Sequence, residues 1–110
     1  MELDITAEED NLIVKLKGEF DHHNADRFRE ELDNELNQGA FNNLVLDLSQ
    51  LTFMDSSGLG AILGRYKSLS LNGGKVKACS LAPQVEKVFD LSGLKKIIPV
   101  YRSLKEAMDD

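Results

Sequence analysis

The sequence has little of what small proteins use for covalent cross-links, for metal clusters or for membrane insertion. It contains one cysteine, Cys79, which excludes an internal disulfide and a cysteine-based zinc cluster. No apolar run approaches the roughly 20 residues that cross a bilayer, and the first ten residues are acidic, unlike a signal peptide. We therefore expect a cytoplasmic protein that has no membrane partner.

Basic residues are the minority, because 13 lysines and arginines stand against 19 acidic residues, for a net charge of −6. Phosphate contacts need clustered cations, so this acidic balance argues against a general nucleic-acid binder. Residues 1–55 carry 14 acidic and 4 basic side chains, a balance of −10, whereas residues 56–110 carry 5 acidic and 9 basic, a balance of +4. The acidic half, including Glu19 and Asp21, is expected to face a basic partner surface.

The remaining composition is that of an ordinary globular protein. The chain has 110 residues, of which 42% are hydrophobic and 29% charged, which argues against disorder and gives enough apolar surface for one core. No repeat, linker or low-complexity segment divides it. We expect a single domain over residues 1–110.

The first half of the chain changes from strand-like to helix-like periodicity. Residues 3–7 alternate apolar and polar, and a polar turn leads to a second apolar run at 12–18, which predicts an antiparallel hairpin. Apolar residues then follow at every fourth position over 28–36, which predicts a helix. Asn24 is a suitable N-cap for it, and Gly39 a suitable residue just past its end.

The second half alternates strands and helices. Residues 44–48 are nearly continuous apolar sequence, typical of a strand covered on both faces. A helix is predicted from near Ser56 to the glycines at 73–74, then a strand at 76–80, and then a helix that opens at Pro83.

The end of the chain predicts one more strand and one more helix. The strand at 97–100 is placed at a sheet edge because Pro99 cannot donate to a ladder. A capping box at 103–106 starts the last helix, and its acidic end at Asp109 and Asp110 is expected to fray. The fold class is therefore α/β, with a mainly parallel sheet of four to five strands, an antiparallel first strand and about four helices.

The stretch FMDSSGLGAILGRY, residues 53–66, joins the buried strand to the next helix and is the most informative segment. It places Asp55, Ser56 and Ser57 at a helix N-terminus, where unpaired N–H groups and the dipole favour an oxygen anion. Each glycine in this helix costs about 1 kcal/mol relative to alanine but allows another backbone or a phosphate to come close. Two interpretations stay open: Ser56 caps the helix, or it is a hydroxyl presented for phosphorylation.

Three blocks of the sequence resemble a known family. MDSSGLG at residues 54–60 resembles the phosphorylation site of the anti-sigma factor antagonists, which are small STAS-domain proteins, and within them most closely the members that act in sporulation. GEFDHHNA at 18–25 and LSGLKKII at 91–98 resemble two further family segments, in the same order. The resemblance covers essentially the whole chain and implies the STAS fold.

The resemblance also implies a mechanism. Unphosphorylated members bind an anti-sigma factor that is itself a serine kinase using ATP and magnesium, and this binding releases the sigma factor. The kinase phosphorylates the first serine of the pair, here Ser56, which weakens binding, and a metal-dependent phosphatase of the PP2C type restores the hydroxyl. The chain is then a kinase substrate, monomeric when free and without a cofactor, and not an enzyme.

The candidate site residues follow from these family positions. Ser57 is the alternative phosphorylation site, because spacing does not separate adjacent hydroxyls. Asp55 orients the hydroxyl or the kinase's metal, or else it caps the helix that begins near Ser56. Asp21 lies where the family has an acidic residue near the phosphorylation site, or else it caps the first helix. The residues expected to contact the partner are Glu19, Asp21, His22, Asp55, Ser57, Gly58, Leu59 and Gly60.

Other functions find less support in the sequence. His22 and His23 are expected on extended backbone with opposed side chains, without a second cluster to complete a metal site, and Cys79 is expected as a buried small hydrophobe. A serine hydrolase would need the G-x-S-x-G elbow, and a dinucleotide or P-loop site would need glycine patterns that are absent from the sequence. The alternatives kept open are a STAS scaffold without phosphorylation and a nucleotide-binding STAS module in a stress pathway.

Overall fold

The computed structural model describes residues 1–39 and 41–110. Within this part the chain forms five strands, four α-helices and one short 3-10 helix, η1. In chain order their bounds are β1 Glu2–Glu8, β2 Asn11–Phe20, α1 His22–Gln38, β3 Asn43–Met54, α2 Ser56–Leu71, β4 Lys75–Cys79, α3 Pro83–Ser92, η1 Leu94–Lys96, β5 Val100–Tyr101 and α4 Leu104–Asp109.

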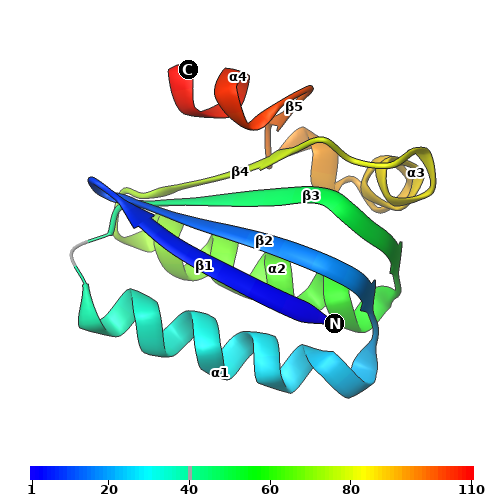
Figure 1. The fold of residues 1–110 in the computed structure, drawn as a ribbon, viewed down its shortest axis with the longest axis horizontal. Coiled ribbons are helices and arrows are strands. Elements are labelled where there is room, and N and C mark those ends of the chain that lie inside the picture. Colours follow the sequence, from blue (N-terminus) through cyan, green and yellow to red (C-terminus); the bar gives the residue numbers. More distant parts are fainter. Residues whose placement is uncertain (40) are drawn as a thin grey trace.

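The strands form one mixed sheet in the order β1-β2-β3-β4-β5 (Figure 1). β1 pairs antiparallel with β2, and the pairs β2–β3, β3–β4 and β4–β5 are parallel. The expected α/β class and the antiparallel first strand are therefore confirmed. Because neighbouring parallel strands end at the same edge, the turns that follow β2 and β3 are brought together.

The main core lies between the sheet and the helices α1 and α2, which run beside each other along one face (Figure 1). Alternate residues of β2 and β3 point into it, as the period of two in a strand requires. Its fully buried members include Leu12, Val14, Leu16, Phe28, Leu32, Leu44, Leu46, Leu48 and Ile62.

The opposite face of the sheet is covered in part by α4, over a small cluster of Ile13, Val45, Cys79 and Ala107. The expected fraying at the end of this helix stays a prediction, and the structure shows contacts that oppose it. The Lys77 ammonium donates to the carbonyl oxygen of Ala107 at 3.0 Å and to a backbone oxygen of Asp110 at 2.7 Å. A cation at the negative end of the helix offsets the unfavourable acidic residues there.

Two strand boundaries differ from the sequence prediction. β3 continues past residue 48 to Met54, because it stays paired with β2 to the end of both strands in spite of two shifts in register. The last strand begins at Val100 rather than at 97, because the chain first makes the turn η1. Pro99 lies just outside the strand and contributes its carbonyl to Ala78 N–H at 3.0 Å, so the edge position is confirmed.

The conformation at the end of α1 differs from the usual one. Gly39 stands at the helix end as expected, but glycine at this place is commonly left-handed, whereas Gly39 lies at φ −121° and ψ 166°, which is extended. A Cβ atom built on Gly39 would collide with the ring of Phe41. The glycine is therefore explained by the packing of that ring rather than by a left-handed cap.

Candidate functional site

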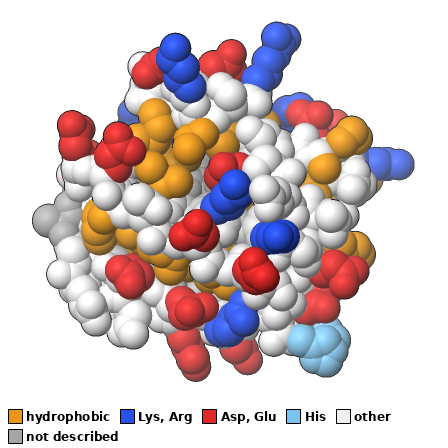
Figure 2. Space-filling view, in the orientation of Figure 1, with side chains coloured by type: hydrophobic (Ala, Val, Ile, Leu, Met, Phe, Trp, Pro, Cys, Tyr) orange, Lys and Arg blue, Asp and Glu red, His pale blue; other side chains and the backbone are white. Residues whose placement is uncertain are grey.

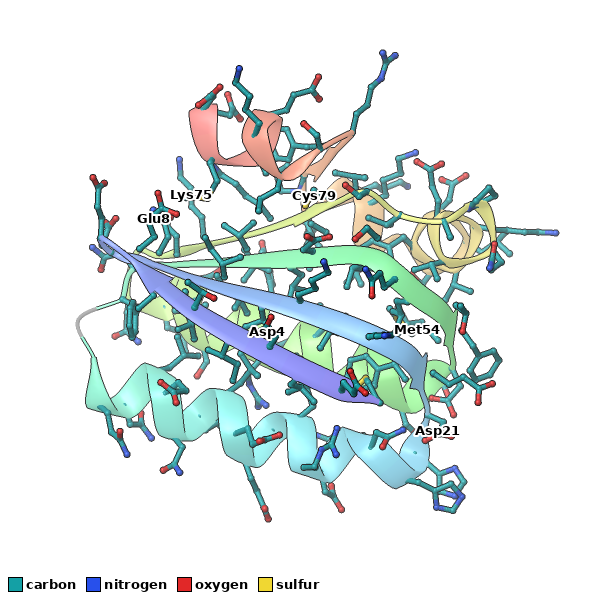
Figure 3. The ribbon with its side chains drawn as sticks, viewed as in Figure 1. Asp4, Glu8, Asp21, Met54, Lys75 and Cys79 are labelled. Carbon is teal, nitrogen blue, oxygen red and sulfur yellow. The ribbon has the colours of Figure 1, made fainter. Side chains whose placement is uncertain are left out.

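The predicted site residues gather where β2 and β3 end and α1 and α2 begin. Each strand is followed by one aspartate, Asp21 or Asp55, and then by a helix. The two turns are joined directly, because Asp55 N–H donates to the carbonyl oxygen of Phe20 at 3.1 Å. Figure 3 shows Asp21 and Met54 at this end of the sheet and Glu8 and Lys75 at the other.

Asp55 is the N-cap of α2. Its carboxylate oxygen Oδ1 accepts from Ser57 N–H at 2.9 Å and from Gly58 N–H at 3.1 Å, which satisfies two N–H groups that a helix start leaves unpaired. Ser56 is the first residue of the helix, so the interpretation of Ser56 as the cap is wrong and the capping alternative for Asp55 is confirmed. Ser56 is exposed, whereas Ser57 is half-buried.

Asp21 is the N-cap of α1, where the sequence favoured Asn24. Its Oδ1 accepts from His23 N–H at 3.1 Å and from the Asn24 side-chain amide at 2.9 Å. The same amide group donates to the carbonyl oxygen of Glu19 at 2.9 Å. Asn24 therefore braces the turn from inside the helix, and the helix begins at His22.

The two histidines do not lie on extended backbone as expected, because both belong to the first turn of α1. Their rings lie close together, with centroids 3.9 Å apart and planes at 38°. Both side chains are exposed, and they protrude at one corner of the surface in Figure 2. The prediction of opposed side chains is wrong because it assumed the period of a strand.

The three glycines of α2 have different surroundings. A Cβ atom on Gly58 would lie 2.9 Å from the carbonyl oxygen of Phe20 and 3.0 Å from Cγ of Met54, so glycine here lets the helix approach the end of β2. A Cβ atom on Gly60 or Gly64 would have no heavy atom within 4 Å. These two glycines leave the outer face of the helix without side chains at their positions, and no intramolecular packing requires them.

Of the other predicted contact residues, Glu19 is exposed and Leu59 is half-buried against the main core. The three carboxylates at this edge belong to Glu19, Asp21 and Asp55. The ion pairs within residues 1–39 and 41–110 are Arg27–Glu31, Arg29–Asp26, Arg65–Asp33 and Lys95–Glu86, so none of them includes these three residues. Glu19 is exposed, whereas Asp21 and Asp55 are half-buried and use their carboxylates as helix caps. The edge is therefore acidic, and Glu19 is its most exposed carboxylate.

Sequence reasoning did not single out Phe53, a large apolar side chain that is 46% exposed and lies three residues before Ser56. Its signal was present in the sequence, because it precedes Met54 and Asp55 in the same block. The strand was expected to end at residue 48, so the sequence did not predict on which face of the sheet the side chain of residue 53 lies.

Other candidate sites in the described part of the chain carry less chemistry. Burial raises the pKa of the Cys79 thiol to about 11, with the nearby Asp47 carboxylate adding to the effect, so this thiol is a poor nucleophile. Among the residues the structure describes, no group of three or more histidine, cysteine and acidic side chains gathers to hold a metal. Nor does any described helix have the length and apolar character that crossing a membrane requires.

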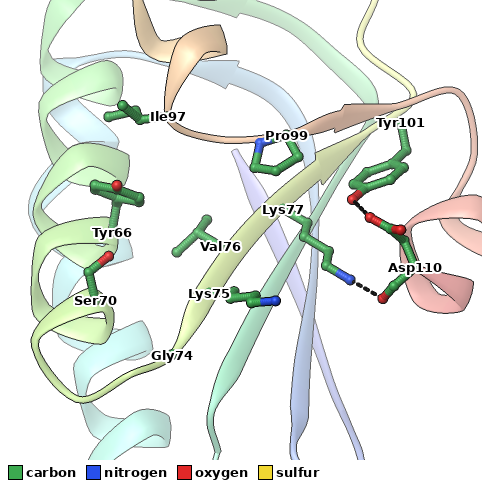
Figure 4. Close-up of a pocket in the computed structure, with 10 residues that line it drawn as sticks. All are labelled: Tyr66, Ser70, Gly74, Lys75, Val76, Lys77, Ile97, Pro99, Tyr101 and Asp110. Carbon is green, nitrogen blue, oxygen red and sulfur yellow. Dashed lines mark hydrogen bonds between the residues drawn. The ribbon is translucent and has the colours of Figure 1, made fainter.

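A pocket of about 400 Å³ lies between the C-terminal half of α2 and the segment leading into β5 (Figure 4). Tyr66 and Ser70 line it from α2, Lys75 from β4, and Pro99 and Tyr101 from the far side. It contains none of the predicted site residues, so the pocket and the edge that carries Ser56 are separate features.

Comparison with known proteins identifies the family. The sequence matches the STAS domain family over residues 2–107. An anti-sigma F factor antagonist of Paenibacillus polymyxa is 44% identical over 99 residues, covering 90% of this chain and 85% of the relative. The anti-sigma factor antagonist SpoIIAA in its unphosphorylated form is similar in structure, with a TM-score of 0.87, 31% identity, and coverage of 98% of this chain and 94% of that one.

The structure of the Bacillus cell fate determinant SpoIIAA in its phosphorylated form is similar as well. Its TM-score is 0.79 at 30% identity, with coverage of 98% of this chain and 97% of that one. These likenesses extend over the strands, the helices and the edge where Ser56 lies. The chain therefore belongs to the STAS-domain family of anti-sigma factor antagonists.

Proposed function

We propose that residues 1–110 act as one STAS domain that antagonises an anti-sigma factor and is switched off by phosphorylation of Ser56. The unphosphorylated chain binds an anti-sigma factor that is also a serine kinase, and this binding releases the sigma factor. A phosphatase of the PP2C type reverses the modification. In this cycle, placed in the cytoplasm, the chain is a substrate and a binding protein, and the catalytic groups belong to its partners.

The observation that carries the proposal is the exposed position of Ser56 on a helix whose cap is already filled. Asp55 already accepts from the N–H groups of Ser57 and Gly58. These two donors are therefore not free to bind a phosphate on Ser56 at the helix N-terminus. Repulsion from the Asp55 carboxylate also directs it outward. This favours Ser56 over Ser57, which is half-buried and whose own N–H is one of the two donors to Asp55.

A phosphate at this position would act on the partner more than on the fold. It adds about −1.5 to −2 charges at pH 7 and three acceptor oxygens. A kinase must bring the γ-phosphate of ATP to the Ser56 hydroxyl, so a phosphorylated Ser56 would meet the phosphates of the next nucleotide. Gly60 has no side chain on the outer face of α2, which lets the partner come close. A close contact at this surface leaves no room for a phosphate on Ser56.

The decisive experiment combines the chain with its cognate anti-sigma kinase, ATP and magnesium, and maps the phosphate by mass spectrometry. The arms are the unmodified sequence, Ser56→Ala and Ser57→Ala. We expect one phosphate on Ser56, none on Ser56→Ala and normal incorporation in Ser57→Ala. Phosphate on Ser57 would reassign the site, and no incorporation in any arm would favour a scaffold that works without phosphorylation.

A further inference from the structure

β1 is an edge strand of the sheet, because β2 alone pairs with it (Figure 1). Its seven residues pair with β2 without a shift in register. Within residues 1–39 and 41–110, no turn, loop or helix forms a backbone hydrogen bond with it. The opposite edge strand, β5, has only two residues and follows Pro99. Short length and proline both protect a sheet edge from pairing with another chain, and β1 has neither protection.

Every second residue of β1 has its backbone groups on the open side of the strand. β1 and β2 are joined by a two-residue turn between the paired residues Glu8 and Asn11, and such a turn is closed by a hydrogen bond between its flanking residues. Hydrogen-bonded and non-hydrogen-bonded pairs alternate along an antiparallel ladder. The N–H and C=O groups of Leu3, Ile5 and Ala7 therefore point away from β2, to where a further strand would lie.

The charges on the outer face of the sheet alternate from strand to strand. Asp4 of β1 pairs with Lys15 of β2, which pairs in turn with Asp47 of β3. Glu2 pairs with Lys17 in the same way. Opposite charges on neighbouring strands stabilise a sheet, and like charges destabilise it. A strand added outside β1 continues this alternation when it carries lysine or arginine at the matching positions.

The acidic side chains of β1 have capacity for such a partner. Glu2, Asp4 and Glu8 are exposed, and Figure 3 labels the last two on the strand. They take part in none of the ion pairs of the described residues. Between them, Leu3 and Ile5 are half-buried and pack against the main core. Apolar side chains on an added strand would cover the surface that these two residues still expose.

A second copy of this chain does not fit the edge. If two β1 strands pair antiparallel about Ile5, Glu2 of each copy lies opposite Glu8 of the other. If they pair about Asp4, the two Asp4 carboxylates lie opposite each other. Like charges in these positions are destabilising. The acidic residues therefore oppose self-association at β1 and leave the edge open to a strand of the opposite charge.

We propose that β1 is a docking edge for an extended basic segment of another protein, in which lysine or arginine alternates with apolar residues. The segment adds one strand to the sheet. Its backbone bonds to Leu3, Ile5 and Ala7, and its basic side chains lie beside the acidic residues of β1. In this mode of recognition the main-chain bonds supply affinity and the alternate side chains supply specificity. The inference does not depend on phosphorylation of Ser56 or on the proposed function.

The test follows the backbone amides of the full chain by heteronuclear NMR while an acetylated heptapeptide that alternates lysine and valine is added. One control peptide alternates glutamate and valine, and another has the lysines grouped at one end. We expect the largest shifts at Leu3, Ile5 and Ala7, and about tenfold weaker binding of both control peptides. Absent shifts along β1 would overturn the inference. Equal binding of the grouped peptide would also overturn it, because charge alone would then explain the attraction.

Two substitutions of Ala7 isolate the backbone contribution. Ala7→Pro removes an outward N–H without removing a bond to β2, which is the position that an edge strand allows to proline. Ala7→Val keeps this N–H. We expect Ala7→Pro to weaken binding of the lysine–valine peptide about fivefold and Ala7→Val to bind like the parent. Circular dichroism verifies that both variants are folded.

Asp4→Asn is the second arm, because it leaves the backbone of β1 unchanged. We expect it to weaken binding of the same peptide about threefold. Parent-like binding by both Ala7→Pro and Asp4→Asn would overturn the inference. Sedimentation of the parent without peptide tests the other occupant: a dimer that Ala7→Pro dissociates would assign the edge to a second copy of this chain and would overturn the inference as well.

Discussion

The starts of α1 and α2 are built on one plan and finished differently. Each follows a parallel strand, each is capped by an aspartate whose Oδ1 accepts from the backbone, and Asp55 N–H links the two turns. The first turn of α1 then carries two bulky imidazole rings, whereas the first turns of α2 carry two hydroxyls and two glycines. The aspartate caps stabilise both helix starts. Only at the start of α2, where Ser56 lies, are the following side chains small.

The largest effect should come from placing the same charge at each helix start. We expect Ser56→Asp to weaken binding to the anti-sigma kinase by about 100-fold or more, roughly 2.7 kcal/mol, because the proposed function has the partner approach most closely at Ser56. His23→Asp adds an equal charge at the neighbouring start and should change affinity by less than about threefold. Calorimetry measures both, and Ser56→Ala should bind like the parent. Equal losses in the two aspartate variants would mean that net charge, and not position, governs binding.

A second comparison separates the glycines within α2. Gly58→Ala should lower the free energy of unfolding by roughly 1–3 kcal/mol, because its Cβ must displace the Phe20 carbonyl or the side chain of Met54. Gly60→Ala meets nothing and should raise the free energy of unfolding by about 0.5–1 kcal/mol. Urea denaturation of the two variants tests this directly. A stabilised Gly58→Ala would contradict the close approach of α2 to β2.

The caps themselves should differ in strength. Asp55→Ala leaves two backbone N–H groups without an acceptor and should cost about 1–2 kcal/mol. Asp21→Ala leaves one such group, that of His23, and should cost about 1 kcal/mol or less. The asparagine variants, which retain an acceptor oxygen, serve as matched controls and should recover most of each loss in thermal unfolding. If Asp21→Ala proves the costlier change, the ranking by satisfied N–H groups is wrong.

The smallest effect is expected from the histidine rings at the start of α1. Because both side chains are exposed, His22→Ala and His23→Ala should each change the free energy of unfolding by less than about 0.5 kcal/mol. Chemical denaturation at pH 7.5 measures the change. A larger loss would show that the paired rings support the helix, and the contrast between the two helix starts would then be one of stability as well as of surface.

The sequence predicted the sheet, its helices and the edge strand well, because periodicity and proline chemistry act locally. It was less successful within the turns. Asp21 and Asn24 are both good caps, and so are Asp55 and Ser56, so residue type alone could not choose between them. The choice is made by contacts across the fold, such as the bond from Asp55 N–H to the Phe20 carbonyl, which join residues 35 positions apart.

Phe53 illustrates a second limit of sequence reasoning. Its exposure depends on the register between β2 and β3, which shifts twice before the strands end. A shift of one residue exchanges the two faces of a strand. The alternating pattern in the buried part of β3 therefore does not predict on which face of the sheet residue 53 lies. Only the paired strands bring Glu19 beside it.

The filled cap at Asp55 has a consequence for the turnover of the protein. If the repulsion from Asp55 and the attraction of the helix N-terminus nearly cancel for a phosphate on Ser56, both forms should unfold with nearly the same free energy, and proteases that act on unfolded chains should degrade them at the same rate. The ratio of the two forms would then depend on the kinase and the phosphatase alone. A pulse-chase comparison of the two forms should give equal half-lives. Degradation would then leave the ratio of phosphorylated to unphosphorylated protein unchanged.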